Sequence, residues 1–345
     1  MNLGGSIRIN KFGVLIITIL LVFLVYYIST GKSRNSNYAL NKNPNEVNLR
    51  KLLIGSIQAA QRGGLEVVEV SKSPDFNVQS KGKTKEGAND PVTDADFRSH
   101  CVMASGLHRI FPKLKIISEE DGEGKSCPDV KLFDLDPTVI HESSNVPDEI
   151  VGIEDVTVWI DPLDATQEYT ENLFMYVTTM VCVAIKGVPT IGVIHNPFTK
   201  KTVWAWADKT VSEPLNVIKR DEDVKHPVVI VSRSHSGNVN ILAKDVFGKN
   251  SHIIPAGGAG YKVLQVLHNN ATAYLHSTAI KKWDICAGNA ILAAIGGRMT
   301  TQQNQDISYS DKDSYVNEHG LLATAVGGVH ELYIKKLIEH QKTLH

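Results

Sequence analysis

Residues 159–166, Trp-Ile-Asp-Pro-Leu-Asp-Ala-Thr, constrain the chain more than any other segment, because an apolar run ends there in two carboxylates three residues apart. Asp161 and Asp164 can turn their oxygens toward one point, and hard divalent cations prefer such ligands. Thr166 adds a hydroxyl beside backbone N–H groups that can hold a phosphate oxygen. Taken alone, the segment favours an ordinary turn with two solvated aspartates, since Asp and Pro are common turn residues.

Two further segments place carboxylates beside predicted elements. Residues 118–121, Ser-Glu-Glu-Asp, follow a short apolar strand predicted near Lys115. Glu119 is therefore one of several carboxylates placed at the end of this strand. Asp284 lies in the first turn of a tightly packed helix predicted over residues 284–295. The helix dipole alone also favours an acid at that position.

A fourth acidic cluster spans residues 89–96, Asn-Asp-Pro-Val-Thr-Asp-Ala-Asp, immediately before a helix predicted over residues 96–111. Thr93, Asp94 and Asp96 all fall where that helix could begin. Helix capping is a sufficient explanation for one of them. It does not explain four acidic clusters in one chain.

The order of these motifs, ending in Trp283-Asp284, resembles the magnesium-dependent, lithium-sensitive inositol monophosphatase superfamily over roughly residues 48–337. The resemblance implies a layered α/β/α/β/α sandwich of the inositol monophosphatase and fructose-1,6-bisphosphatase type. Residues 161–166 and 232–237, with an apolar N-terminus, most resemble the Golgi branch that acts on adenosine 3′,5′-bisphosphate. That branch shares Ala165, where much of the superfamily has Gly, so the alanine does not indicate lost activity.

The resemblance also implies roles for individual residues. The expected ligands of two or three Mg²⁺ ions are Glu119, Asp161, the Leu163 carbonyl, Asp164 and Asp284. Asp96 and Thr166 would orient and deprotonate the attacking water. The expected contacts to substrate come from Ala165, Thr166, Ser232, His235, Gly258 and Lys262. From the residues alone, His235 is equally a surface-loop histidine and Lys262 equally a helix lysine that extends to solvent.

The implied reaction is hydrolysis of the 3′-phosphate of adenosine 3′,5′-bisphosphate to AMP, which would clear the by-product of Golgi sulfotransferases. One alternative is a phosphatase of inositol monophosphate or another sugar phosphate. Another is a non-catalytic, metal-binding member of the fold, although every side chain expected to bind metal is a carboxylate. The net charge of −1 argues against a nucleic-acid partner.

Residues 12–28 are uncharged and almost wholly apolar, near the lower length limit for a membrane-spanning helix. We therefore expect a single-pass type II Golgi membrane protein with a lumenal catalytic domain. Its expected parts are a short cytoplasmic tail (1–11), a signal anchor (12–28), a stem (29–47) and a phosphatase domain (48–345). Flanking basic residues are balanced, so the positive-inside rule gives no orientation. The glycosylation sequon at Asn270 is usable only in a lumenal domain.

The four cysteines have neither zinc-site spacing nor the density of a disulfide scaffold. Cys182, in an apolar strand, and Cys286, on a packed helix, are expected to be buried thiols. The charged residues 71–87 are predicted to form a mobile loop that could act as a lid. Periodicity further predicts helices over 47–70 and 261–267 and strands near 156–160, 178–186, 188–195, 203–207, 228–232 and 273–275.

Overall fold

The computed structural model describes residues 17–23, 43–73, 76–83, 89–121, 126–140, 146–212, 215, 226–233 and 238–343. The chain divides into two units, Met1–Lys42 and Asn43–His345. Residues 17–23 of the first unit are helical. None of the described helices combines the length and the apolar character that crossing a membrane requires. The remainder of the anchor predicted at residues 12–28 lies outside the described residues.

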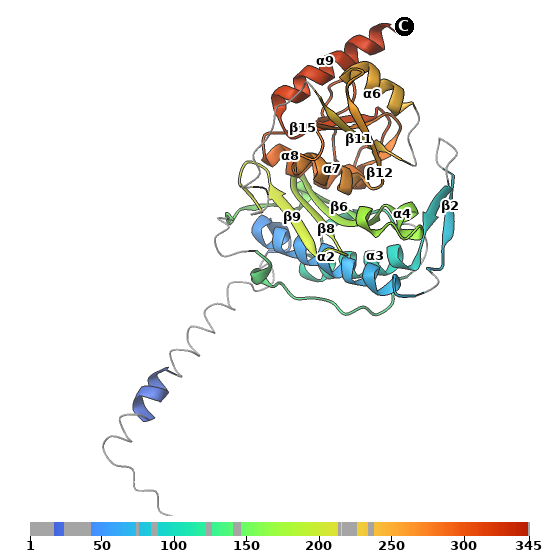
Figure 1. The fold of residues 1–345 in the computed structure, drawn as a ribbon. Coiled ribbons are helices and arrows are strands. Elements are labelled where there is room, and N and C mark those ends of the chain that lie inside the picture. The colour runs from blue at the N-terminus through green and yellow to red at the C-terminus, as the bar shows by residue number, and fades with distance from the viewer. Residues whose placement is uncertain are drawn as a thin grey trace, which may run out of the picture. The chain divides into compact units, whose positions relative to one another are not determined.

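The second unit alternates layers of helices and sheets (Figure 1). Within its described residues, one helix pair covers the outer face of a six-stranded sheet, a second pair separates that sheet from a five-stranded sheet, and a third pair covers the far face. This is the predicted α/β/α/β/α order. In layer order, the helices are α2 (Leu49–Val70), α3 (Asp94–Ile110), α7 (Ala259–Leu267), α8 (Lys282–Ala294), α6 (Val239–Phe247) and α9 (Gly327–Thr343).

The first sheet has the strand order β10-β9-β8-β7-β6-β4 and is antiparallel except for the β4–β6 pair. Helices cover both of its faces, and every residue of β6, which lies between β7 and β4, is accordingly buried. The β7–β8 hairpin turns at Gly187, between the strands predicted near residues 178–186 and 188–195. The strands are β4 (Lys115–Ser118), β6 (Val156–Asp164), β7 (Thr178–Ile185), β8 (Val188–Asn196), β9 (Lys201–Trp206) and β10 (Thr210–Val211).

Strand β6 runs further than its predicted end near residue 160. Asp161 pairs with Met180 and Asp164 with Thr178, and the register shifts between these two pairs. A bulge of this kind absorbs Pro162, which has no N–H to give to the ladder. Both aspartates therefore belong to a buried strand rather than to a turn.

The second sheet has the order β12-β11-β13-β17-β15, with β11 parallel to both of its neighbours. Only β11 and β13 match predicted strands. The others are short and carry no hairpin turn signal, and α6 and α9 were also not predicted. The strands are β11 (Val228–Ser232), β12 (His252–Ala256), β13 (Ala273–His276), β15 (Arg298–Thr300) and β17 (Leu321–Thr324).

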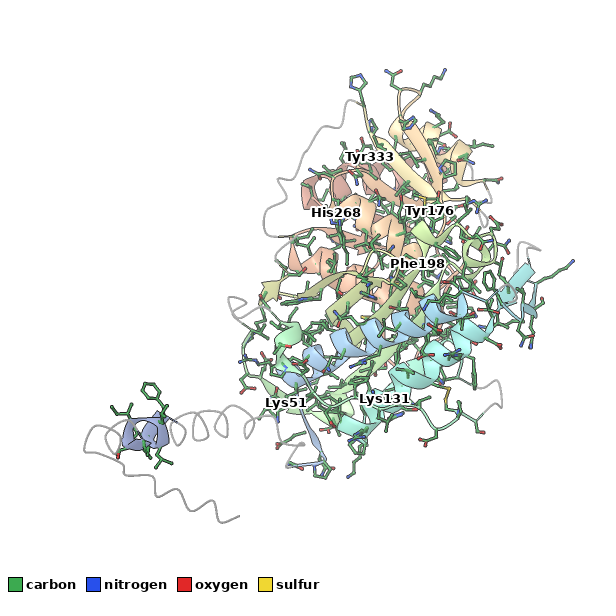
Figure 2. All side chains as sticks on the ribbon, turned by 60° about the horizontal axis from the view of Figure 1, so that its bottom comes forward. Lys51, Lys131, Tyr176, Phe198, His268 and Tyr333 are labelled. Carbon is green, nitrogen blue, oxygen red and sulfur yellow. A yellow bond between two sulfur atoms is a disulfide. The ribbon has the colours of Figure 1, made fainter. Side chains whose placement is uncertain are left out.

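Two glycines set the outer helix layer against the first sheet. A Cβ at Gly63 of α2 would lie 2.5 Å from Ser99 Oγ of α3, and a Cβ at Gly64 would lie 2.8 Å from the His195 ring of β8. Helix α2 can therefore approach both neighbours closely. Lys51 on α2 and Tyr333 on α9 mark the two outer helix layers in Figure 2.

The prediction of a mobile loop over residues 71–87 is wrong in part. Strand β2 (Gln79–Lys83) pairs antiparallel with β3 (Asn89–Val92), so residues 79–83 of this segment belong to a hairpin. The sequence of β2 is charged and contains glycine, so it lacks the alternating apolar pattern from which a strand would be predicted. The remaining short elements are β1 (Glu46–Asn48), β5 (Ile150–Gly152), β14 (Ile280–Lys281), β16 (Val316–Asn317), α4 (Thr166–Thr170) and the 3₁₀ turns Pro137–Val139, Ile153–Asp155 and Phe174–Tyr176.

Cys182 and Cys286 are buried as expected, but the expectation that they are free thiols is wrong. These two residues form a disulfide that joins β7 to α8, and Cys101 forms a second disulfide with Cys127. The partners lie 104 and 26 residues apart in sequence. Helix α8 packs on β7 only in the folded chain, so spacing alone could not reveal the pairing.

Candidate active site

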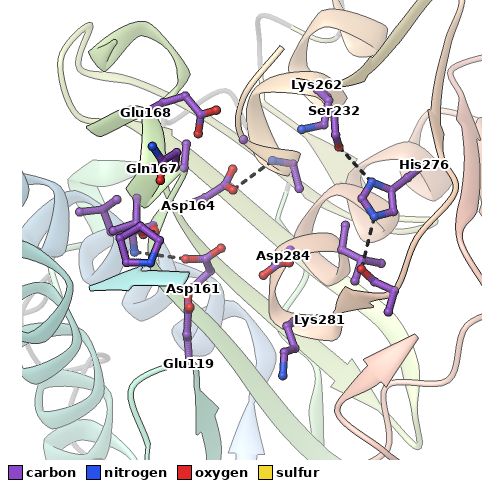
Figure 3. A pocket seen from close by; sticks show the side chains of 18 of the residues that line it. Glu119, Asp161, Asp164, Gln167, Glu168, Ser232, Lys262, His276, Lys281 and Asp284 are labelled. Atoms are coloured by element: carbon purple, nitrogen blue, oxygen red, sulfur yellow. Dashed lines mark hydrogen bonds between the residues drawn. The ribbon is translucent and has the colours of Figure 1, made fainter. Parts of the chain in front are cut away.

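A cavity of about 370 Å³ opens between the ends of strands from both sheets (Figure 3). Its lining includes every described residue for which the sequence implied a role in metal or substrate binding. Those residues are Glu119, Asp161, Leu163, Asp164, Ala165, Thr166, Ser232, Gly258, Lys262 and Asp284. His235 lies outside the described residues, so its predicted contact stays a prediction.

Three of the predicted ligands converge most closely. Glu119, just after β4, Asp161 on β6 and Asp284 in the first turn of α8 each offer an oxygen, and these oxygens lie within 4.8 Å of one another. We call these three residues the acidic triad. Asp161 is buried, and the other two are partly exposed to the cavity. Three distant segments of the sequence therefore meet at one point.

The electrostatics of the triad call for a cation. Burial raises the pKa of Asp161 well above its usual value, and the charges of Glu119, Asp164 and Asp284 raise it further. Burial likewise raises the pKa of Asp284, followed by the charges of Glu119 and Asp164. Buried like charges are costly unless a positive charge joins them. An all-oxygen donor set of this kind fits a hard cation such as Mg²⁺.

Asp164 lies beside the triad but is held differently. Its Oδ1 accepts a hydrogen bond from Ala259 N at 3.0 Å, and its Oδ2 accepts from Gly260 N at 2.8 Å and from Thr178 Oγ1 at 3.1 Å. Asp164 thus ties the N-terminus of α7 to the first sheet. It is not one of the three residues whose oxygens converge within 4.8 Å.

The predicted pair of water-orienting residues is in contact. Thr166 Oγ1 lies 3.0 Å from Asp96 Oδ1 and 3.1 Å from the Leu163 carbonyl oxygen. Asp96 also closes the capping box of α3, because its Oδ2 accepts hydrogen bonds from Thr93 N and Thr93 Oγ1. Burial raises the pKa of Asp96, although these hydrogen bonds oppose the rise. A more basic carboxylate is better able to take a proton.

Ala165 occupies a conformation that suits glycine better. Its φ of 74° and ψ of 44° are left-handed, and it directly precedes the short helix α4. Gly258, with a φ of 62°, lies across the cavity, and a Cβ there would come within 3.4 Å of the Ala165 methyl and 2.7 Å of the Tyr176 carbonyl oxygen. The close approach of the two loops therefore requires glycine at 258.

Lys262 is buried, so the alternative of a helix lysine extending to solvent is wrong. It lies on α7 with 3% of its surface exposed, and its Nζ is 3.5 Å from the Ala256 carbonyl oxygen. Burial lowers its pKa to about 8, against the opposing charges of Asp164, Glu168 and Asp284. A buried lysine thus stands at the edge of the cavity.

The sequence argument missed several charged neighbours of the site. Lys81 Nζ, on the β2–β3 hairpin, lies 3.2 Å from Glu119 Oε1 and 2.5 Å from Glu120 Oε1. Burial raises the pKa of Glu120 to about 8. Arg233 pairs with Glu168 of α4 and with Glu171 just after it, which links the end of β11 to the short helix that follows β6. No sequence signal identified these contacts, since each joins segments far apart in the chain.

The sequence model of the inositol monophosphatase family matches residues 48–342. The chain belongs to this family. A Drosophila melanogaster protein named "Putative inositol monophosphatase 3" is 53% identical over 345 residues, which cover 98% of this chain and 96% of that protein. The human "Golgi-resident adenosine 3′,5′-bisphosphate 3′-phosphatase" is 43% identical over 363 residues, which cover 99% of each.

Solved structures agree with the family assignment at the level of the fold. The inositol monophosphatase from Anabaena superposes with a TM-score of 0.60 at 19% identity, covering 84% of this chain and 96% of that one. The chain is thus a phosphoric monoester hydrolase of the inositol monophosphatase family, with the acidic cluster that a metal-dependent family requires.

Proposed function

We propose that this family member is a magnesium-dependent phosphatase that removes the 3′-phosphate of adenosine 3′,5′-bisphosphate and releases AMP. The observation that carries the proposal is the position of Lys262, a buried cation at the cavity edge formed by the second sheet. In Figure 3, Lys262 and Ser232 lie on the opposite side of Asp164 from Glu119. A substrate with a second anionic group can use this edge as well as the triad. Inositol monophosphate has only one such group.

The chain's own residues fit the cation that the reaction needs. The acidic triad, Asp164 and the Leu163 carbonyl would hold magnesium. Bound there, the metal supplies positive charge for the phosphate and for the leaving oxygen, and it promotes ionisation of the attacking water.

The pair Thr166 and Asp96 positions that water. The Thr166 hydroxyl shares its proton with Asp96 Oδ1 and the Leu163 carbonyl, so its lone pairs can accept a hydrogen bond from the water. Asp96, whose pKa burial raises, takes up the proton. The backbone amides of Ala165 and Thr166 hold the reacting phosphate, because both residues line the cavity at the left-handed turn that precedes α4.

The same proposal places the catalytic unit in the Golgi lumen behind an anchor at residues 12–28. Disulfides persist in oxidising compartments, and both cysteine pairs of the second unit are bonded. The sequon residue Asn270 is exposed at the end of α7. A relative at 43% identity is named as Golgi-resident.

Localisation has its own test, using sealed microsomes and glycosidase. We expect added protease to spare the catalytic unit until detergent is present. We also expect endoglycosidase to increase the gel mobility of the wild type but not of Asn270→Gln. Digestion without detergent, together with identical mobility of both proteins, would contradict a lumenal site.

A second candidate substrate is inositol monophosphate, because the relative at 53% identity is named for that activity. Phosphate release from the full chain in magnesium separates the two candidates. We expect kcat/KM for adenosine 3′,5′-bisphosphate to exceed that for inositol 1-phosphate at least about tenfold, since only the first can engage Lys262. The reverse ratio would show that the substrate is the inositol phosphate.

A further inference from the structure

Strands β11 and β13 lie side by side and parallel, with Ile230 opposite Tyr274. Because the carboxyl ends of parallel strands meet at one edge, Ser232 and His276 end the two strands together at the cavity. Side chains alternate along a strand, so Tyr274 faces α7 and α8 rather than α6 and α9. Ser232, Tyr274 and His276 all line the cavity.

The Tyr274 hydroxyl is buried and has no hydrogen-bond partner among the described residues. The Ser232 hydroxyl comes near it but not within hydrogen-bond geometry. Burial raises the pKa of Tyr274 well above its usual value, and the charges of Asp164 and Asp284 add to the rise, so the phenol keeps its proton. A buried hydroxyl without a partner lowers stability, whereas phenylalanine would fill the same space at no such cost.

The Ser232 hydroxyl, unlike that of Tyr274, already has a hydrogen-bond partner in His276. Ser232 Oγ lies 3.0 Å from His276 Nδ1, while His276 Nε2 lies 3.0 Å from Thr278 Oγ1 and 3.4 Å from the Ala279 carbonyl oxygen. The Ala279 carbonyl oxygen can only accept from Nε2, whereas the Thr278 hydroxyl can either donate or accept, and in either tautomer His276 Nδ1 is bonded to the Ser232 hydroxyl. Of these two hydroxyls, that of Tyr274 is therefore the one left without a partner among the described residues.

A cation lies beside this donor. Lys262 Nζ is 5.2 Å from the centre of the Tyr274 ring, and both side chains are buried in the cavity wall. A hydroxyl donor and an ammonium group at one place favour an anionic oxygen such as that of a phosphate. Glu119 and Asp161 of the acidic triad lie on the other side of Asp164 from Lys262, where the reacting phosphate belongs (Figure 3).

We propose that Tyr274 is a substrate-binding residue whose hydroxyl, together with Lys262, binds the second phosphate of a nucleoside bisphosphate. This inference rests on the proposed function and assigns the 5′-phosphate to the edge formed by β11 and β13. Tyr274 would thus distinguish a bisphosphate from a monophosphate substrate.

The test is Tyr274→Phe in the full chain, which removes only the hydroxyl. We expect kcat/KM for adenosine 3′,5′-bisphosphate to fall about tenfold or more, while kcat/KM for adenosine 3′-monophosphate changes less than about twofold. In calorimetry, the variant should bind AMP about tenfold more weakly than the wild type does. The thermal midpoint of the ligand-free variant should equal or exceed that of the wild type, because no hydrogen bond is lost.

Tyr309→Phe is the matched control, since Tyr309 is also fully buried but its hydroxyl accepts a hydrogen bond from the Asn289 amide. This control should lower the thermal midpoint and leave the ratio between the two substrates unchanged. Equal losses of Tyr274→Phe on both substrates, or undiminished AMP binding, would overturn the role of Tyr274 alone. A wild type that neither hydrolyses the bisphosphate nor binds AMP would overturn the proposed function as well.

Discussion

The cavity wall that comes from the first sheet and α8 differs in chemistry from the wall that comes from the second sheet and α7. The first wall gathers carboxylates, including the acidic triad and Asp164. The second presents an ammonium group, two hydroxyls and an imidazole from Lys262, Ser232, Tyr274 and His276. Hydrolysis of a bisphosphate needs a bound cation at the reacting phosphate and positive charge or hydrogen-bond donors at the second phosphate. The two walls can serve these two tasks separately. The difference indicates that turnover and selectivity can be altered separately.

The largest expected effect is loss of turnover when the acidic wall is broken. Asp161→Asn should lower kcat by about a thousandfold or more on every phosphate substrate, because Asp161 is the buried centre of the triad. Steady-state phosphate release with saturating magnesium measures this effect. Asp155→Asn, which removes a surface carboxylate paired with Lys186, is the control and should retain wild-type turnover.

The same variant gives a reading that does not depend on activity. Magnesium should raise the thermal midpoint of the wild type, since it relieves repulsion among buried carboxylates, and should raise that of Asp161→Asn much less. Wild-type kcat in Asp161→Asn, or an equal magnesium shift in both proteins, would remove Asp161 from the metal site.

The second prediction concerns two buried histidines outside the cavity, His195 on β8 and His330 on α9. Burial lowers the pKa of His195 on β8 and of His330 on α9 to about 4 in each case. The unfolded chain therefore binds more protons than the folded chain between about pH 4 and 6.5, and stability is lost as the pH falls through that range. Each histidine should contribute about 3 kcal/mol to that loss.

Urea unfolding at pH 7 and pH 4.5 measures the histidine contribution. His195→Gln and His330→Gln should each flatten the pH dependence of the unfolding free energy by a similar amount, although each also loses a hydrogen bond at both pH values. An unchanged pH dependence in either variant would show that its histidine is not kept neutral by burial.

A third prediction addresses selectivity at the second wall. Lys262→Met keeps most of the side-chain volume and removes the charge, so kcat/KM for adenosine 3′,5′-bisphosphate should fall about tenfold to thirtyfold, with little change for inositol 1-phosphate. Lys244→Met on α6 is the control, since Lys244 Nζ bonds the Ser251 carbonyl and does not line the cavity. Equal losses on both substrates would mean that Lys262 supports Asp164 rather than the nucleotide.

The smallest expected effect is at the junction of the two walls. Ala165→Gly should stabilise the protein by about 0.5 kcal/mol, because glycine takes the left-handed conformation without the steric cost that alanine pays, although it also loosens the unfolded chain. Differential scanning calorimetry would detect the change. A marked loss of stability would show that the Ala165 methyl contributes packing that outweighs its strain.

The acidic wall could largely be predicted from the sequence. Asp161, Glu119 and Asp284 each end or begin a strongly apolar element, and the structure brings them together as expected. The layered fold followed from the family resemblance, while periodicity alone indicated only a mixed α/β chain. Strand β6 was longer than predicted because a bulge lets its ladder continue past Pro162.

The second wall could not be predicted to the same degree. Tyr274 lies in the short segment Ala-Tyr-Leu-His, which reads as an ordinary buried strand. Its role depends on which hydroxyls find partners, and that is decided by neighbours more than forty residues away, such as Ser232 with His276. The contact between Lys81 and Glu119 could not be predicted for a similar reason, because only the β2–β3 hairpin brings the two side chains together. Such contacts leave no local pattern.

The disulfide between Cys182 and Cys286 makes assembly of the catalytic centre dependent on the redox conditions in which the chain folds. It closes a loop with a sequence separation of 104, and constraining a loop of that size in the unfolded state is worth roughly 4–5 kcal/mol. That is a large fraction of the 5–15 kcal/mol that typically holds a domain together. Asp284 sits two residues before Cys286 on the same helix. Protein produced in a reducing host would therefore have to assemble its carboxylates on a helix that is anchored by packing alone, so yield and specific activity should depend on where the chain is made.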